Sequence, residues 1–183
     1  MGKELVEVTA ECDLRVIVQG DLKVSKQCTK AVNTANRILG LINRTLEFKS
    51  KDTVLQLYKS LVRPHLEYCI QCWNPYYRKD IELIEKVQRR ATRMIDSLKK
   101  YSYHERLQRL QLTTLESRRV RGDLIEVYKI MNGFEDIDYR DYFNISSTGL
   151  RGHEMKLYKS RFNTTIRGNS FSRRIIDNWN NLM

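Results

Sequence analysis

Apolar residues recur at three- and four-residue steps along much of the chain, a pattern typical of helices with one buried face. The first such stripe runs from about residue 25 to residue 46. Ser50 then precedes a second stripe as a capping residue, and Pro64 predicts that this second helix kinks or restarts. A third stripe, over residues 81–95, alternates with charged residues. The pattern therefore predicts three amphipathic helices in the first half of the chain.

Two pairs of residues in the second half have the spacing of helix capping boxes. These pairs are Ser102 with Glu105 and Thr113 with Glu116. They predict a short helix over 103–110 and a long one over 115–132, which Asn132-Gly133 would end in a left-handed conformation. A last apolar stripe predicts a terminal helix from about Ser170, with one face formed by Phe171, Ile175, Ile176, Trp179 and Leu182.

Strand signals are confined to the start of the chain. Residues 14–18 (LRVIV) are rich in β-branched side chains and are followed by Gln19-Gly20-Asp21, which predicts one strand and a turn. Residues 134–150 are acidic and aromatic without a period, which predicts a loop or linker. The expected fold is mainly α, a helical bundle with one short N-terminal strand.

Charge changes this picture by pointing to a partner. The chain has 33 Lys and Arg against 22 Asp and Glu, a formal net charge of +11, which favours a polyanionic partner. Residues 78–121 carry a net charge of +7 and residues 151–176 one of +6, whereas residues 122–150 carry −4. Positive charge gathered in two segments indicates a binding face.

The third predicted helix is the most basic. Four cations lie within two turns of it: Lys86, Arg89, Arg90 and Arg93. They are spaced to follow a phosphate backbone. The alternative is a solvated face, because Glu82 could pair with Lys86, and Glu85 with Arg89, across one helical turn.

A second group of cations opens the long helix. Arg118, Arg119 and Arg121 lie where positive charge opposes the helix dipole, at a cost of a few tenths of a kcal/mol each. We interpret them as residues that contact an anion.

Aromatic residues cluster between the second and third helices. Tyr76 and Tyr77 follow Pro75 beside Arg78 and Lys79, and exposed rings next to cations could stack on bases. For Trp73 and Tyr68 we expect core packing.

No catalytic centre, metal site or cofactor site is predicted. His65, Cys69 and Cys72 offer three potential zinc ligands on adjacent turns without a recognisable fourth, so we expect core cysteines there. The chain has no Asp-Asp pair, no Gly-rich phosphate loop and no nucleophile elbow.

Targeting signals do not emerge from the sequence either. No apolar run is long enough to span a membrane, the first residues do not form a signal peptide, and four cysteines show no framework spacing. We expect an intracellular protein of the cytoplasm or nucleus that is not secreted and has no membrane partner.

Beyond these patterns, residues 57–95 (LYKSLVRPHLEYCIQCWNPYYRKDIELIEKVQRRATRMI) resemble the region after the polymerase palm in reverse transcriptases of non-LTR retrotransposons, particularly the jockey-like group. The resemblance extends through DLKVSKQCTKAVNTANRILGLI (21–42), RGDLIEVYKIMNGFEDID (121–138), RGHEMKLYK (151–159) and NSFSRRIIDNWNNL (169–182). It departs near the start, where Arg15 stands at a position usually occupied by Gly and Gln19 at one usually occupied by Asp.

This resemblance implies a thumb-like helical domain with an extension, both gripping a primer–template. It divides the chain into a palm edge (1–24), a basic thumb-like domain (25–133), an acidic linker (134–150) and a basic helical extension (151–183). In the family, the catalytic aspartates lie in the palm, before the region that this chain resembles. The resemblance therefore implies a fragment of an RNA-directed DNA polymerase that is not an enzyme on its own.

The expected partner is RNA or an RNA–DNA duplex, contacted through its backbone, and a separate polymerase palm is a further possible partner. The predicted contacts are Lys86, Arg89, Arg90, Arg93, Arg118, Arg119, Arg121, Tyr76 and Tyr77. A non-catalytic helical interaction module, or a non-functional remnant of an element, is the alternative. Oligomeric state is left open.

Overall fold

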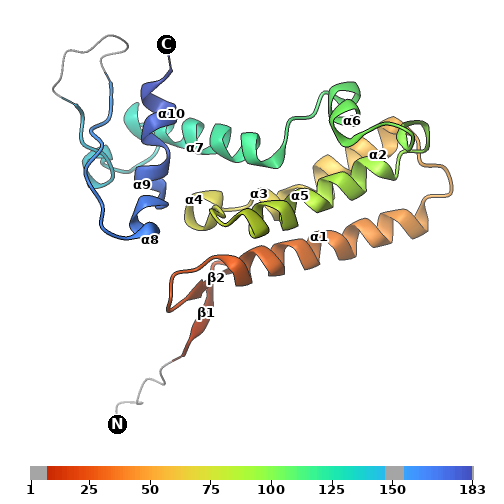
Figure 1. The fold of residues 1–183 in the computed structure, drawn as a ribbon, viewed down its shortest axis with the longest axis horizontal. Coiled ribbons are helices and arrows are strands. Elements are labelled where there is room, and N and C mark those ends of the chain that lie inside the picture. The colour runs from red at the N-terminus through yellow and green to blue at the C-terminus, as the bar shows by residue number, and fades with distance from the viewer. Residues whose placement is uncertain (1–7, 147–154, 183) are drawn as a thin grey trace. The chain divides into compact units, whose positions relative to one another are not determined.

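A computed structural model describes residues 8–146 and 155–182, which form two compact units (Figure 1). The chain is mainly helical, with a short two-stranded hairpin near its start. The first unit comprises residues 8–69 and 75–115, and the second comprises residues 70–74 together with the described residues after 115.

The first unit begins with an antiparallel hairpin and continues in helices. Its elements are β1 (Ala10–Asp13), β2 (Val16–Gln19), α1 (Ser25–Thr45), α2 (Lys51–Leu57), η1 (Tyr58–Val62), α3 (Pro64–Glu67), α5 (Arg78–Arg93), η2 (Asp96–Leu98) and α6 (Tyr103–Leu110). The long helix α1 packs against α3, η1 and α5, and Figure 1 shows α5 alongside α1. Their buried apolar residues form the core of this unit.

Local sequence signals account for the starts of α2 and α6. The Ser50 hydroxyl accepts a hydrogen bond from the Thr53 amide at the start of α2, at 3.2 Å. The capping box of α6 is confirmed, because the Ser102 hydroxyl accepts from the Glu105 amide and the Glu105 carboxylate accepts from the Ser102 amide.

The predicted single strand is wrong in extent. Residues 14 and 15 form a tight turn between two strands, with φ values of +42° for Leu14 and +69° for Arg15. Hairpin turns of this kind need positive φ at both central residues, and Asn or Gly is the usual signal for them. Because the turn has Leu14 and Arg15 in place of Asn or Gly, no sequence signal predicts β1 (Ala10–Asp13).

The break near Pro64 also differs from a simple kink. The chain widens into a π-helical turn, in which the Arg63 amide donates to the Tyr58 carbonyl at 2.9 Å. Pro64 has no amide hydrogen to donate, and its ring would clash with the carbonyl one turn earlier in a regular helix. The wider turn avoids both problems before α3 begins.

The second unit is built on the long helix α7 (Leu115–Met131), together with α4 (Ile70–Trp73). Its other elements are η3 (Tyr139–Asp141), α8 (Thr165–Gly168), α9 (Phe171–Arg174) and α10 (Ile176–Asn180). Gly133 has a φ of +68° and ends α7 as expected, with the Phe134 amide donating to the Lys129 carbonyl. The core consists of Val127, Ile130, Met131, Phe143, Leu157, Ile175, Ile176 and Trp179.

The predicted terminal helix is broken in two at Ile175, and Leu182 is 43 % exposed instead of sharing the buried face. Residues 134–146 are irregular apart from η3 and one antiparallel bridge between Ile145 and Leu157, yet Phe143 lies in the core of the unit. Residues 147–154 lie outside the described residues. The functional division of the chain expected from its sequence stays a prediction.

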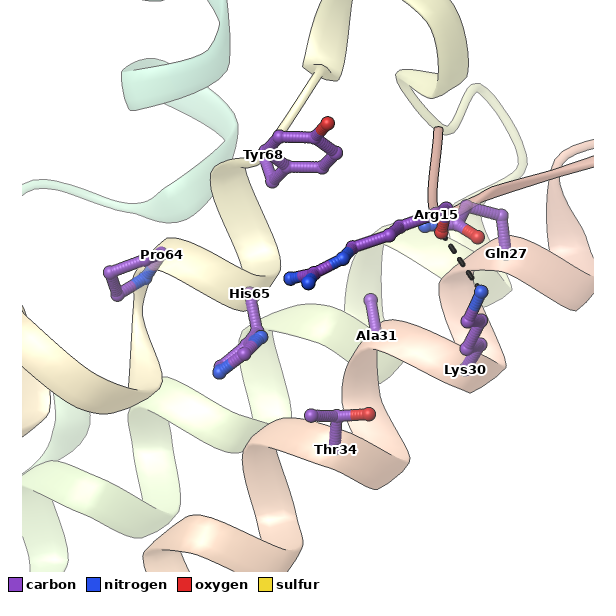
Figure 2. A pocket seen from close by; sticks show the side chains of 8 residues that line it. All are labelled: Arg15, Gln27, Lys30, Ala31, Thr34, Pro64, His65 and Tyr68. Atoms are coloured by element: carbon purple, nitrogen blue, oxygen red, sulfur yellow. Dashed lines mark hydrogen bonds between the residues drawn. The ribbon is translucent and has the colours of Figure 1, made fainter. Parts of the chain in front are cut away.

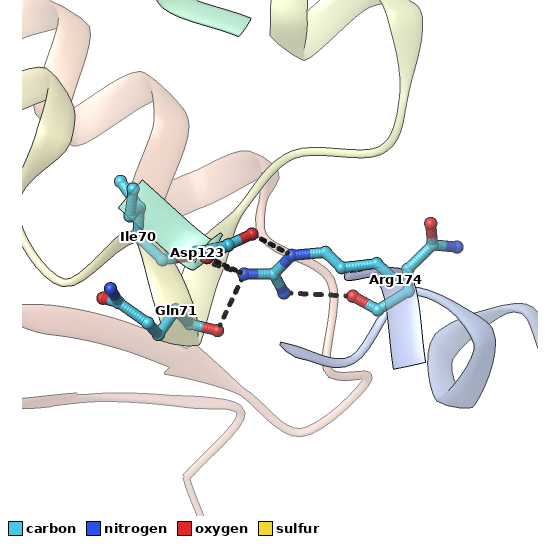
Figure 3. Close-up of polar contacts among 5 residues, drawn as sticks. Ile70, Gln71, Asp123 and Arg174 are labelled. Carbon is cyan, nitrogen blue, oxygen red and sulfur yellow. Dashed lines mark hydrogen bonds and ion pairs between the residues drawn. The ribbon is translucent and has the colours of Figure 1, made fainter. Parts of the chain in front are cut away.

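A buried ion pair links three segments of the second unit (Figure 3). The Arg174 guanidinium donates to both carboxylate oxygens of Asp123, at 2.9 and 3.0 Å, and to the carbonyls of Ile70 and Gln71, at 3.1 and 3.2 Å. Burial raises the pKa of the Asp123 carboxyl, and the positive charge of Arg174 opposes this effect. The pair joins α9 to α7 and α4.

Candidate nucleic-acid interface

Helix α5 presents one basic side and one buried side. Lys86, Arg89, Arg90 and Arg93 are all exposed, and we call these four residues the basic stripe. Their spacing of three and four residues places them on one face of the helix. On the opposite side Ile84, Val87 and Ala91 are at most 1 % exposed. The structure therefore brings together the four cations predicted for this helix.

Buried polar side chains fix the inner side of α5. The Gln88 amide donates to the Tyr103 hydroxyl and to the Thr113 carbonyl, both at 3.0 Å, while its oxygen accepts from the Tyr58 hydroxyl at 2.7 Å. The Tyr103 hydroxyl in turn donates to Glu85. Burial raises the pKa of the Tyr58 hydroxyl, which keeps it a neutral donor. These bonds hold α5 in a defined rotation about its axis, with the basic stripe outward.

The acidic residues expected to neutralise the stripe are engaged elsewhere. Glu85 is buried and also accepts from the Leu115 amide at 3.0 Å, while Glu82 pairs with Arg78 at 3.1 Å. In the described part of the chain, no ion pair joins a residue of the basic stripe to a carboxylate. The pairs of Glu82 with Lys86 and of Glu85 with Arg89, on which the solvated-face alternative depended, are thus not formed in the described residues.

Neutral partners orient two of the guanidinium groups. Arg90 donates to the side-chain oxygen of Asn36 on α1 at 3.1 Å. The guanidinium carbon of Arg89 lies 5.0 Å from the centroid of the Tyr103 ring. Such contacts restrict the side chains while leaving their positive charge available to an anion.

At one end of α5 the stripe borders a concave, positively charged surface. This basic pocket, of about 280 Å³, is lined by Asn43, Lys49, Arg90, Arg93, Met94 and Lys99. Lys99 pairs with Asp96 at 2.7 Å, so one of its four cations is partly neutralised. Burial lowers the pKa of the Arg106 guanidinium, and the positive charge of Arg93 lowers it further.

The other cations of the pocket were not predicted from the sequence. Lys49 precedes α2 and Lys99 follows η2, so neither belongs to the periodic pattern of a helix. The fold places both lysines next to the end of α5, where they line the pocket with Arg90 and Arg93. The two segments also contact each other, because the Asp96 amide donates to the Lys49 carbonyl at 3.4 Å. Only the Lys99-Lys100 doublet gave a local signal.

The second predicted group of cations belongs to the other compact unit. Arg119 is 2 % exposed, and its guanidinium carbon lies 5.9 Å from the Trp73 ring centroid. A buried guanidinium cannot reach a phosphate backbone, so the prediction is wrong for this residue. Arg118 is half-buried and Arg121 is exposed. Of the three cations at the start of α7, Arg119 therefore has a structural role, because it packs on Trp73.

Tyr76 and Tyr77 contact each other, with ring centroids 4.4 Å apart and planes tilted by 40°. Lys79 lies 5.6 Å from the centroid of the Tyr77 ring. Burial and the hydrogen bond with Tyr77 raise the pKa of Tyr76 to about 12, and the negative charges of Asp21 and Asp80 contribute. The structure thus brings the two rings together beside Lys79, and their contact with bases stays a prediction.

The expected packing of the remaining aromatic and sulfur side chains holds in part. Trp73 is 1 % exposed, as expected for a core residue, whereas Tyr68 is 51 % exposed. Cys72 and His65 are exposed too, so they are not core residues. Within residues 8–146 and 155–182, no cluster of three metal-ligating side chains is present. None of the helices described is both long and apolar enough to cross a membrane.

Comparisons with protein-family models, with curated proteins and with solved structures give no match to this chain.

Proposed function

We propose that the basic stripe and the basic pocket bind the phosphate backbone of RNA or of an RNA–DNA duplex without sequence preference. The observation that carries the proposal is the basic pocket, where Arg90 and Arg93 meet Lys49 and Lys99 around one concavity. Backbone binding needs several cations on one surface and no base-reading groups. The stripe extends this surface along α5 by two further charges.

We further propose that this is the role of a thumb-like domain in a reverse transcriptase of the non-LTR type, as the sequence resemblance implies. A thumb holds the duplex behind the active site, for which basic helices are suited. By this proposal the chain binds a primer–template without extending it, and a separate palm is needed for polymerisation. Incubating the chain with primer–template and deoxynucleotides should yield no extension product, and extension in a purified preparation would contradict this part.

The test of binding is its dependence on salt. Each phosphate contact adds about one unit to the slope of log affinity against log salt concentration, so Arg90→Ala with Arg93→Ala should flatten the slope by about two units. Affinity for a mixed-sequence RNA–DNA duplex, measured by fluorescence anisotropy between about 50 mM and about 200 mM salt, gives this slope.

A matched control removes the same charge from residues that have partners within the protein. Arg78 pairs with Glu82, and the guanidinium of Arg109 lies 3.8 Å from the Tyr101 ring centroid. Arg78→Ala with Arg109→Ala should leave the slope nearly unchanged. Equal slopes for the two double variants would show that net charge alone governs binding, and the proposed site would be wrong.

A further inference from the structure

A second concave surface of the first unit lies away from the basic pocket. It is a cleft of about 460 Å³ between α1, α3 and the hairpin turn, and its polar lining residues are Arg15, Gln27, Lys30, Thr34, His65 and Tyr68 (Figure 2). Thr34 of this cleft and Asn36 beside Arg90 are two positions apart on α1, so they point in nearly opposite directions from a helix with about 3.6 residues per turn. The cleft is thus distinct from the surface proposed to hold a duplex backbone.

The backbone of Arg15, which lines this cleft, has an unfavourable conformation. Its φ of +69° is the left-handed region, which costs a non-glycine residue about 1–2 kcal/mol. The conformation is fixed by bonds to the turn: Lys30 donates to the Arg15 carbonyl at 2.9 Å, and the Tyr68 hydroxyl donates to the Leu14 carbonyl at 3.1 Å. These bonds fix the backbone from which the Arg15 side chain extends into the cleft.

The guanidinium of Arg15 reaches into the cleft between the ring of Tyr68 and the imidazole of His65 (Figure 2). In the part of the chain that is described, no carboxylate pairs with Arg15, and no Asp or Glu lines the cleft. Thr34 offers a hydroxyl on the same surface, while Tyr68 offers an exposed aromatic ring. Positive charge, a hydroxyl and an aromatic wall are the groups that bind a phosphate attached to a planar ring.

We infer that this cleft binds the phosphate of a nucleotide, with Arg15 as the group that holds the phosphate and Tyr68 as the wall for the base. The volume lies within the range of small-molecule sites, and it exceeds what a bare phosphate would fill. A free nucleoside monophosphate and the 5′-phosphorylated end of a strand carry the same chemistry. The site is independent of the proposed backbone interface, and each can fail without the other.

Arg15→Gly offers a test in which loss of binding cannot be attributed to unfolding. Glycine adopts positive φ without strain, so the variant keeps the turn while losing the guanidinium. Leu14→Gly is the matched control, because Leu14 has a φ of +42° in the same turn and is 78 % exposed. Both variants should unfold at a temperature close to that of the parent chain.

Binding of uridine monophosphate, uridine and inorganic phosphate would be measured by isothermal titration calorimetry on the full chain. We expect the monophosphate to bind more tightly than uridine or phosphate, and Arg15→Gly to weaken it by about tenfold or more while Leu14→Gly does not. Unaltered affinity in Arg15→Gly, equal affinity for uridine, or no heat at millimolar monophosphate would each overturn the proposal.

Two short oligonucleotides, one with a 5′-phosphate and one with a 5′-hydroxyl, identify the source of the ligand. Preference for the phosphorylated strand, abolished by Arg15→Gly, supports a strand end as the ligand. Binding of the monophosphate alone supports a free nucleotide.

Discussion

The ion pair between Arg174 and Asp123 allows a quantitative test of the second unit. Arg174→Ala removes a guanidinium that donates to one buried carboxylate and to the carbonyls of Ile70 and Gln71. The side chain of Asp123 is only 2 % exposed and that of Arg174 only 14 %, so water cannot readily replace the lost donors. The substitution leaves a negative charge in a largely dry environment.

The expected loss follows from this burial. Removing one partner of a buried ion pair costs about 3–5 kcal/mol, because the other charge stays desolvated. The charge of Arg119 also lowers the pKa of Asp123, so it still favours the ionised carboxylate after Arg174 is removed. We therefore expect the lower end of the range, a fall of about 3 kcal/mol in the free energy of unfolding of this unit.

Urea unfolding followed by tryptophan fluorescence measures this free energy in the right unit. The chain has two tryptophans, Trp73 and Trp179, and both belong to the second unit. Arg167→Ala, which removes an exposed arginine of the same unit, should change the free energy of unfolding by less than about 0.5 kcal/mol. Replacing both members of the pair, as in Asp123→Leu with Arg174→Met, should restore stability to within about 1 kcal/mol of the parent.

A loss below about 1 kcal/mol for Arg174→Ala would refute this reasoning, because that value is typical of an exposed pair. So would a double variant no more stable than the single one, since the uncompensated charge would then not be the cause of the loss.

Glu85→Gln tests how α5 is positioned, and Gly133→Ala, compared with Gly40→Ala, tests how α7 ends. Glu85→Gln replaces a carboxylate that accepts from three donors by an amide, whose own hydrogens cannot serve as acceptors. The free energy of unfolding, measured by urea denaturation, should fall by about 1–3 kcal/mol. An unchanged value would mean that the network does not fix α5. Gly133→Ala, at a φ of +68° with open space around it, should cost about 1 kcal/mol from conformation alone, whereas Gly40→Ala within α1 should stabilise by about 0.5–1 kcal/mol in the same assay. Equal effects at the two glycines would contradict the assigned backbone conformation.

The sequence predicted those parts of the fold that depend on local signals. The helix over residues 25–45, the cap at Ser50 and the capping box at Ser102 were all foreseen, because each depends on residues within one or two turns of one another. The stop at Gly133 is of the same kind. The hairpin escaped prediction because the residues of its turn, Leu14 and Arg15, adopt positive φ without being the residues that usually do so.

Only the part of the candidate site that lies on α5 was predicted from the sequence. Helical spacing gathered the basic stripe on α5, but it could not show that Lys49 and Lys99 complete a pocket, since their proximity depends on how loops pack. Spacing also could not separate Arg119, which is buried, from Arg121, which is exposed. The removal of Glu85 from the surface likewise depends on Tyr103 and Leu115, which are distant in the sequence.

The central claim is that the basic pocket contacts a nucleic-acid backbone, and the side-chain NMR signals of individual arginines test it most directly. In a titration of the full chain with a mixed-sequence RNA–DNA duplex, the Nε–H signals of Arg90 and Arg93 should shift. Those of Arg78, which pairs with Glu82, and of the buried Arg119 should not. If the duplex binds while the signals of Arg90 and Arg93 stay in place, or if nothing binds at low salt, the account of this surface is contradicted.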